Sequence, residues 1–191
     1  MIIVRSPLRI TLGGGGTDFK SYYSEKEGFL ISAAIDKYVY VTIIEPFSDG
    51  FFLKYSNQEK TDDIFTIKHP IIRETLKLIS PNINKIEITT LADIPSGTGL
   101  GSSGSFTCAL ISALYANKGH YIDKLKLAEL ACEIEIEKLN QPIGKQDQYI
   151  SAFGGINSII FQKDNITNVK PLTLSSETIY DLEDNLLLFF T

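Results

Sequence analysis

The sequence has little cysteine, and the spacing of its two cysteines indicates neither a metal knuckle nor a disulfide framework. Cys108 and Cys132 both fall in segments with the pattern of amphipathic helices, so we expect buried, unreactive thiols in a reducing compartment. The N-terminal segment lacks the apolar core and cleavage site of a secretion signal. No apolar run approaches the roughly 20 residues that a membrane span needs. We therefore predict a soluble, cytoplasmic protein without a membrane partner.

Positive charge is also in deficit. The 191 residues include 18 Lys and Arg against 23 Asp and Glu, which gives a formal net charge of −5. Binding along a nucleic-acid backbone needs an excess of positive charge, so we expect no nucleic-acid partner. The hydrophobic fraction of 43% and the charged fraction of 21% are those of an ordinary globular protein. These values leave the oligomeric state open.

The apolar pattern predicts more strands than helices in the first half of the chain. Strands are predicted at residues 1–12, 51–56, 84–94 and 156–163, with two more inside 28–46 that break near Asp36 and Lys37. Helices are predicted at residues 69–80, 102–117, 123–139 and 144–153. This order favours an α+β fold over regular βαβ alternation.

The last residues, 185–191, have the pattern of a buried strand that has just begun. A chain that stops in its most hydrophobic stretch is typical of a fragment, and we interpret residues 1–191 as a single N-terminal domain of a longer protein.

The stretch "PSGTGLGSSGS", residues 95–105, has too few large side chains to build a core. A glycine-rich segment that leads into a helix exposes backbone N–H groups and the positive end of the helix dipole, and together these bind phosphate. The alternative is a flexible turn in which Ser102 or Ser103 caps the helix. The predicted phosphate-binding residues are Pro95, Ser96, Gly97, Gly99, Leu100, Gly101, Ser102, Ser103, Gly104 and Ser105.

The same stretch contains the dinucleotide-binding spelling Gly99-x-Gly101-x-x-Gly104. In that fold the first glycine follows the strand closely and an acidic residue ends the next strand. Here about seven residues separate the strand from Gly99, and the downstream acids fall on a helix. A nucleotide-linked oxidoreductase is therefore the weaker alternative.

The nucleoside-triphosphate P-loop is excluded because it ends in Gly-Lys-Ser/Thr, and no lysine occurs between Lys85 and Lys118. Protein-kinase signatures are missing too. The loop offers hydroxyl groups instead, and hydroxyl oxygens are suitable magnesium ligands beside phosphate oxygens.

Glu135 lies on the wrong face of its predicted helix for a solvated acid. At about 100° per residue, Glu129, Glu133 and Glu137 share a solvated ridge with Lys126, and Glu135 points the opposite way. Its apolar neighbours on that face are Leu125, Leu127, Ala128, Ala131, Cys132, Ile134 and Leu139. A buried carboxylate needs compensation, either from a buried salt bridge to Arg or Lys or from a magnesium ion held with a serine and ATP phosphates.

Two further segments carry candidate residues for chemistry. Asp147 follows a Pro-Ile-Gly turn among polar neighbours; it is either a helix-capping residue or a base held by neighbouring donors, which phosphoryl transfer to a hydroxyl uses. In "SPLRITLGGGGTDF", Arg9 lies on a strand and Asp18 follows a run of four glycines. Asp18 could bind sugar hydroxyls and Arg9 a transferring phosphate; the alternative is an Asx-capped turn with a surface arginine.

Together these stretches resemble the GHMP small-molecule kinases, over roughly residues 1–160. "PSGTGLGSSGS" is similar to their phosphate loop, and "SPLRITLGGGGTDF" to their substrate-side motif. The resemblance implies a mixed sheet with helices on one side, ATP and Mg²⁺ as cofactors, Ser103 and Glu135 as magnesium ligands, and Asp147 as the catalytic aspartate assisted by Arg9. The implied substrate-binding residues are Arg9, Gly15, Gly16, Thr17, Asp18 and Asp147.

Within this family, "LRITLGGGGTD", "PIGKQDQY" and "AFGGIN" are most similar to the kinases of D-glycero-D-manno-heptose 7-phosphate, which phosphorylate the anomeric hydroxyl. Gly15 and Gly16 stand where galactokinases carry Glu-His, which argues against galactose itself. A fucose- or galactose-type acceptor and a non-catalytic sugar-phosphate-binding module remain as alternatives. The family's C-terminal glycine-rich motif has no counterpart here, so this chain alone is expected to be inactive.

Overall fold

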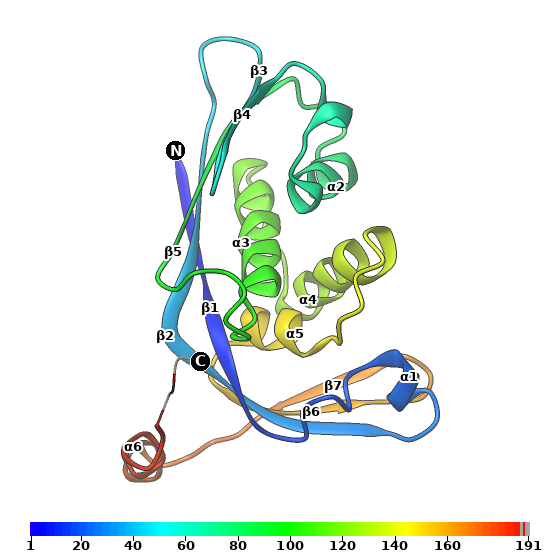
Figure 1. Cartoon of the computed structure of the whole chain (residues 1–191), viewed down its shortest axis with the longest axis vertical. Helices are drawn as coiled ribbons and strands as arrows, with labels where there is room; N and C mark the ends of the chain where they lie inside the picture. The colour runs from blue at the N-terminus through cyan, green and yellow to red at the C-terminus, as the bar shows by residue number, and fades with distance from the viewer. Residues whose placement is uncertain (188, 190–191) are drawn as a thin grey trace.

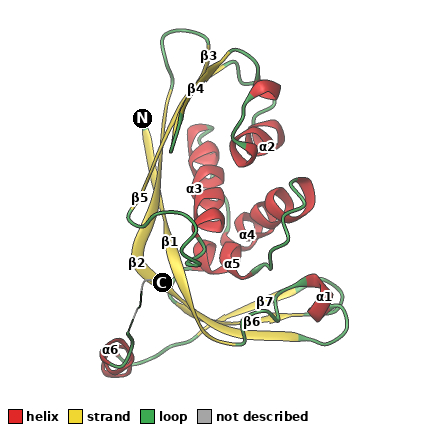
Figure 2. Ribbon diagram, in the orientation of Figure 1, coloured by secondary structure: helices red, strands yellow, loops and turns green. Residues whose placement is uncertain are grey.

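A computed structural model describes residues 1–187 and 189, which form a seven-stranded mixed sheet (Figures 1 and 2). The strand order is β4-β3-β5-β2-β6-β7, and β1 pairs with β2 outside that order. β3 and β5 are parallel, and every other pair is antiparallel. The strands are β1 (Ile2–Gly13), β2 (Gly28–Ile44), β3 (Gly50–Lys54), β4 (Gln58–Thr61), β5 (Lys85–Ala92), β6 (Ile156–Phe161) and β7 (Thr167–Pro171).

The prediction of two strands inside residues 28–46 is wrong, because residues 28–44 form one continuous strand. The predicted break near Asp36 and Lys37 falls where the β1–β2 register shifts, between the pairs Pro7–Tyr38 and Arg9–Ala34. Such a bulge bends a strand without ending it. β2 consequently pairs with β6 through its first half and with β5 through its second half.

Four helices pack against one face of this sheet (Figure 2), as predicted. They are α2 (Pro70–Ile79), α3 (Ser102–Asn117), α4 (Lys124–Cys132) and α5 (Gln146–Phe153). α3 lies at the centre and is in contact with the sheet and with the three other helices, so it is apolar all round and its Ala109, Leu110 and Ile111 are fully buried. The core forms two clusters, a larger one around α3 and a smaller one between β6 and α5.

The predicted helix 123–139 changes type midway. α4 ends at Cys132, and residues Glu133–Lys138 continue as a π-helix, η2. Isolated π-helical turns inside helices are frequent at functional sites. The phase argument still holds for Glu135, which is fully buried, but not for Leu125, which is 44% exposed.

Several short elements have no sequence prediction. They are α1 (Lys20–Tyr23), β4, the 3-10 turn η1 (Ile64–Thr66), β7 and α6 (Ser176–Asp184). α6 lies apart from the other helices (Figure 1) and buries none of its residues. Of the predicted C-terminal strand, Leu186, Leu187 and Phe189 are exposed and not in a strand; residues 188 and 190–191 lie outside the described residues.

Both cysteines are free and buried, as predicted. Burial raises the pKa of the Cys132 and Cys108 thiols, which keeps them protonated and unreactive. Over residues 1–187 and 189, no helix is both long enough and apolar enough to cross a membrane.

Candidate active site

The loop between β5 and α3 has the backbone of an anion-binding nest. Gly97, Gly99 and Gly101 all adopt left-handed conformations, with φ of 88°, 73° and 78°. Alternating left-handed residues turn successive N–H groups toward one concavity. A side chain at Gly97 or Gly99 would meet no atom within 4 Å, so the space beside these residues is open to a ligand.

The start of α3 is uncapped. Gly101 occupies the N-cap position, and no side chain accepts a hydrogen bond from the first turn. The capping alternative for Ser102 and Ser103 is therefore wrong. The first N–H groups of this 16-residue helix remain available for an anion at the positive end of the helix dipole.

Leu100 anchors the loop, because it is only 9% exposed and belongs to the main apolar cluster. Ser105 belongs to the interior as well. Its Oγ donates to the Pro7 carbonyl and lies 2.9 Å from Ser151 Oγ, and its N–H donates to Gly101 O at 3.0 Å. Both groups have internal partners, which corrects the prediction that Ser105 binds phosphate.

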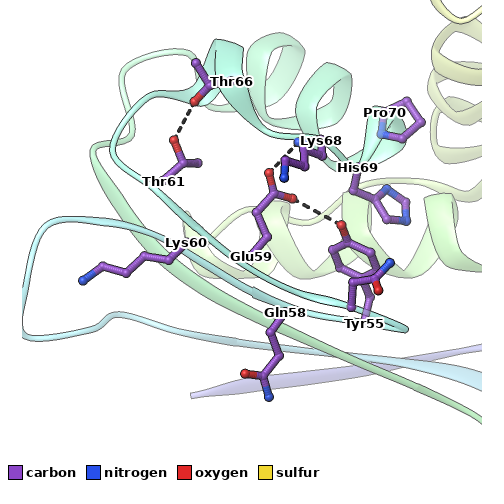
Figure 3. Close-up of a pocket in the computed structure, with 10 residues that line it drawn as sticks. Tyr55, Gln58, Glu59, Lys60, Thr61, Thr66, Lys68, His69 and Pro70 are labelled. Carbon is purple, nitrogen blue, oxygen red and sulfur yellow. Dashed lines mark hydrogen bonds between the residues drawn. The ribbon is translucent and has the colours of Figure 1, made fainter.

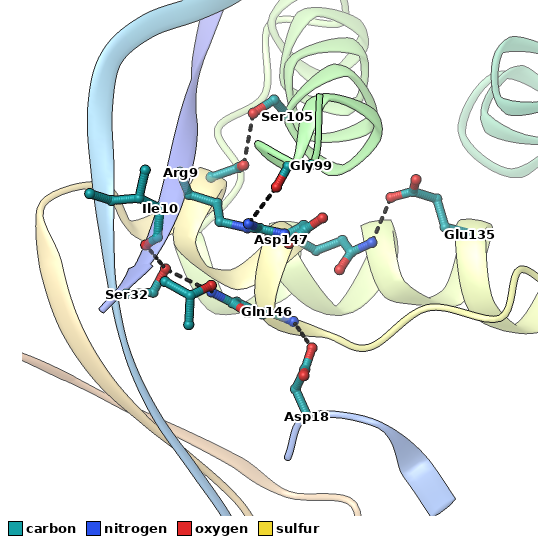
Figure 4. Close-up of polar contacts among 12 residues, drawn as sticks. Arg9, Ile10, Asp18, Ser32, Gly99, Ser105, Glu135, Gln146 and Asp147 are labelled. Atoms are coloured by element: carbon teal, nitrogen blue, oxygen red, sulfur yellow. Dashed lines mark hydrogen bonds and ion pairs between the residues drawn. The ribbon is translucent and has the colours of Figure 1, made fainter. Parts of the chain in front are cut away.

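Arg9 joins the phosphate loop to Asp147 (Figure 4). Its Nη1 donates to Gly99 O at 2.8 Å, and its backbone N–H donates to Leu100 O at 3.0 Å. Its Nε and Nη2 both lie 2.6 Å from Asp147 Oδ1. The surface-arginine alternative is wrong, because the guanidinium lies between the loop and the carboxylate.

Two glycines allow α3 to approach Asp147 closely. A Cβ at Gly104 would lie 2.7 Å from Asp147 Cβ, and one at Gly101 would lie 3.0 Å from Arg9 Cγ. Asp147 Oδ2 accepts no hydrogen bond from the described residues. Burial raises the pKa of this carboxyl, Arg9 lowers it, and Asp18 raises it; the net shift is upward.

Glu135 is fully buried and has one hydrogen-bonded oxygen and one without a partner. Its Oε2 accepts a hydrogen bond of 2.7 Å from Gln148 Nε2, and no described residue bonds to Oε1. Burial raises the pKa of Glu135, and Gln148, Ser103 and Thr107 lower it. No Arg or Lys among the described residues forms a salt bridge with it, so the buried salt-bridge alternative is wrong.

A divalent cation fits this donor set. A buried carboxylate oxygen without a partner, close to the exposed serine at the uncapped start of α3, is what a magnesium ion with phosphate and water ligands uses. Within residues 1–187 and 189 there is no cluster of three or more His, Cys, Asp or Glu side chains that could hold a metal without such additional ligands.

Asp18 is held against the start of α5. It is 5% exposed, and its Oδ2 accepts a hydrogen bond of 3.0 Å from Gln146 N (Figure 4). A Cβ at Gly144 would lie 1.9 Å from that same oxygen, so only glycine allows the contact. Oδ2 thus accepts from a residue 128 positions away, which differs from the local Asx-capped turn named as the alternative. Oδ1 has no partner among the described residues.

Thr17 has a structural role that the sequence did not reveal. Its Oγ1 lies 2.8 Å from Gly14 O and 3.0 Å from Phe29 O, and it accepts a hydrogen bond of 3.1 Å from Phe29 N. These contacts join the glycine run to β2. Gly15 and Gly16 are exposed beside it, and their predicted contact with substrate stays a prediction.

An apolar pocket beside the phosphate loop has no counterpart in the sequence analysis. It has a volume of about 650 Å³ and opens onto Ser102 and Ser103. Its remaining lining residues come from β2, the residues after β3, the start of α2 with the residue before it, the end of β5 with the loop after it, and α3; they include Val39, Tyr55, His69, Ile71, Leu91, Ile94 and Phe106. The only signal for this pocket in the sequence is the set of aromatic and apolar residues at the ends of helices and strands. Such residues also occur in ordinary cores, so they do not distinguish a pocket.

A second groove adjoins this pocket and has a volume of about 900 Å³ (Figure 3). Tyr55 and His69 line both. The Glu59 carboxylate lines the groove and accepts hydrogen bonds from Lys68 N at 2.6 Å and from the Tyr55 hydroxyl at 3.3 Å. His69 is the N-cap residue of α2, where its Nδ1 accepts a hydrogen bond from Ile72 N.

Comparison with known proteins agrees with this geometry. Residues 69–155 match the sequence model described as the GHMP kinases N terminal domain. The chain is 31% identical to the D-glycero-alpha-D-manno-heptose 7-phosphate kinase of Campylobacter jejuni, over 100% of this chain and 59% of that protein. It is 29% identical to the galactokinase of Pyrococcus furiosus, over 100% of this chain and 53% of that protein. The chain thus spans little more than half the length of these relatives.

Solved structures share the fold. A D-glycero-D-manno-heptose 1-phosphate kinase from Bacteroides thetaiotaomicron superposes with a TM-score of 0.89 at 27% identity, over 96% of this chain and 63% of that one. The mevalonate kinase of Methanococcus jannaschii has a TM-score of 0.69 at 21% identity, over 90% and 56% of the two chains, which shows the fold alone. The sequence match over residues 69–155, the identity along the whole chain and the shared fold make this chain similar to the N-terminal part of the GHMP kinases.

Proposed function

We propose that the chain is the ATP-binding and catalytic portion of a cytoplasmic sugar kinase. Its proposed acceptor is the anomeric hydroxyl of D-glycero-D-manno-heptose 7-phosphate. The observation that carries the proposal is the position of Arg9, which contacts the Gly99 carbonyl on one side and the Asp147 carboxylate on the other. A phosphate donor bound by the N–H groups of the loop and a hydroxyl acceptor bound by Asp147 would meet at this guanidinium.

The donor side fits a nucleoside triphosphate. The N–H groups of the loop and of the first turn of α3 face an open concavity that suits the phosphates. The adjoining pocket of about 650 Å³ is of a size and apolarity suited to a nucleoside. An orientation with the base against Phe106 would direct the phosphates toward Ser102 and Ser103.

Glu135 Oε1 and the Ser103 hydroxyl would hold magnesium, which neutralises phosphate charge when bound. The protein supplies a carboxylate that has no basic partner among the described residues, so its charge is available to a cation.

On the acceptor side, Asp147 Oδ2 is free to accept the hydrogen bond of the sugar hydroxyl. Whether or not the proton fully transfers, this contact orients the attacking oxygen, because loose phosphoryl transfer needs little base catalysis. Arg9 holds Asp147 in place through Oδ1 and offers positive charge to the transferring group. Asp18 Oδ1 is available to the sugar.

The preference for a heptose phosphate is supported by two relatives. One is named a heptose 7-phosphate kinase and matches the whole chain in sequence, and the other is named a heptose 1-phosphate kinase and matches 96% of the chain in structure. The glycine run supports it too, because a side chain at Gly16 would meet no atom within 4 Å. The segment therefore leaves room for an acceptor larger than galactose.

Phosphoryl transfer is tested in the full-length protein, by incubating it with ATP, Mg²⁺ and one acceptor at a time and following products by phosphorus NMR. The acceptors are heptose 7-phosphate, mannose 6-phosphate, galactose and fucose, with Asp147→Asn as the inactive control. A new anomeric phosphate from the heptose alone is the expected result. Binding of a heptose phosphate without transfer would indicate a binding module, and preferential binding of NAD would favour the oxidoreductase alternative.

A further inference from the structure

Gln148 is a buried polar residue whose role is not explained by its sequence position. It follows Asp147 on α5, and the sequence suggested that such neighbours hold the base. In the structure its side chain is fully buried and turns away from Asp147, and its Nε2 donates to Glu135 Oε2 at 2.7 Å. Successive helical residues point about 100° apart, so α5 presents Asp147 to Arg9 and Gln148 to η2.

Glu135 depends on this contact. A carboxylate at 0% exposure needs hydrogen-bond donors to stay in place, and Gln148 provides the only hydrogen bond of normal geometry to it within the described part of the chain. That bond occupies one oxygen. The other oxygen, Oε1, is left without a partner.

We propose that Gln148 is a positioning residue that fixes the Glu135 carboxylate with Oε2 occupied and Oε1 free for the divalent cation of the phosphate donor. This inference rests on the proposed function, because the cation enters with the nucleotide.

The side-chain amide of Gln148 is uncharged, and this affects how strongly Glu135 can bind a cation. A lysine or arginine at this position would neutralise the carboxylate and compete with the cation, whereas an amide satisfies one oxygen and leaves the negative charge in place. The groups around Glu135 agree with this role: Ser103 and Thr107 offer hydroxyls, and Asp147 adds negative charge.

The backbone of Gln148 is fixed by close packing. Cys108 Sγ on α3 donates to Gln148 O at 3.4 Å, and a Cβ at Gly104 would lie 3.1 Å from Gln148 N. The residue that orients Glu135 is thereby held against the helix that carries Ser103.

The test measures cation affinity separately from nucleotide affinity in the whole 191-residue chain. Free Mn²⁺ is titrated by its EPR signal in the presence of a saturating non-hydrolysable ATP analogue. Affinity for the analogue without metal is measured by calorimetry in EDTA. Gln148→Met removes the donor at similar volume.

Gln146→Met is the matched control. Gln146 is also a buried glutamine of α5, but its Nε2 bonds to Thr11 at 2.5 Å and to Ser32 at 2.9 Å, away from Glu135. Outer-shell partners of metal ligands typically contribute 10- to 100-fold to metal affinity. We therefore expect Gln148→Met to weaken Mn²⁺ binding about tenfold or more, and Gln146→Met to change it by less than about twofold.

Equal Mn²⁺ affinity in the two variants would overturn the inference, and so would a parallel loss of metal-free nucleotide affinity in Gln148→Met. If that variant does not fold, Gln148→Glu replaces it. A carboxylate of equal size beside Glu135 is expected to weaken Mn²⁺ binding as well, and wild-type affinity in this variant would overturn the inference. If the wild-type chain binds no Mn²⁺ in the presence of the analogue, the inference and the proposed donor site both fail. If the wild-type chain binds Mn²⁺ and the variants bind it with the same affinity, only the inference fails.

Discussion

The molecule has two glycine-rich segments, residues 13–16 at the end of β1 and residues 97–104 after β5, and they use glycine for opposite reasons. At Gly97 and Gly99 the missing side chains leave open space beside an exposed backbone. At Gly14 a Cβ would lie 2.1 Å from Phe29 O, so the missing side chain lets the chain pack against β2. All three have positive φ. Composition alone does not distinguish a ligand-binding loop from a packing turn; the surrounding atoms do.

The largest effect on stability is expected from Gly14→Ala. The added methyl group clashes with a backbone oxygen that cannot move aside, which costs about 1–3 kcal/mol, and the left-handed backbone adds about 1–2 kcal/mol. Urea unfolding of the chain measures the sum. A loss below about 1 kcal/mol would mean that the 13–16 segment is as open as the phosphate loop.

Asp147→Asn tests the carboxylate that Arg9 links to the loop between β5 and α3. Asparagine keeps the hydrogen bond to Arg9 but cannot accept the sugar proton, so turnover of the full-length protein should fall about 100-fold or more. The affinity for ATP, measured by calorimetry, should not change. Unchanged turnover would remove Asp147 from the chemistry and leave it a structural partner of Arg9.

Gly97→Ala should affect ATP affinity more than stability, whereas Gly14→Ala should mainly affect stability. The new methyl group enters open space, so stability should fall only by the cost of the left-handed conformation, about 1 kcal/mol. The methyl group also occupies the proposed phosphate concavity, and ATP affinity should fall about tenfold, which corresponds to about 1.4 kcal/mol. Wild-type affinity would place the phosphates elsewhere.

Glu135→Gln should raise stability slightly while weakening magnesium dependence. Burial raises the pKa of Glu135. The contribution of this residue to the stability of the fold is therefore full at pH values below its unfolded-state pKa, and it is lost as the pH rises through its folded-state pKa. A non-titrating glutamine avoids that loss. A rise of one in the pKa of a carboxyl corresponds to about 1.4 kcal/mol of unfolding free energy. The melting temperature of Glu135→Gln should rise by about 2–4 °C for each kcal/mol gained.

The stability gain of Glu135→Gln should grow between acidic and neutral pH and then level off. Thermal unfolding at several pH values measures it. A variant less stable than the wild type at neutral pH would mean that Glu135 is held by an interaction other than the Gln148 hydrogen bond.

The sequence located the site better than it assigned the roles within it. Helical phase predicted that Glu135 points inward, and it does so even though the helix becomes a π-helix there. Leu100 is the one large side chain in a run of small ones, and the structure buries it in the main apolar cluster. Leu125 and Ser105 were assigned wrongly, because a local pattern does not show which neighbours cover a helix face.

Local sequence determined where the backbone could turn and where it needed glycine, because turn chemistry and helical periodicity act over a few residues. Tertiary structure decided which distant groups meet. Arg9 and Asp147 are 138 residues apart in the sequence, and Arg9 Nε lies 2.6 Å from Asp147 Oδ1. It also decided that Gln148 bonds to Glu135 and not to its sequence neighbour. These pairings depend on how α3 and α5 pack over β1, and that packing is a property of the assembled sheet and helices.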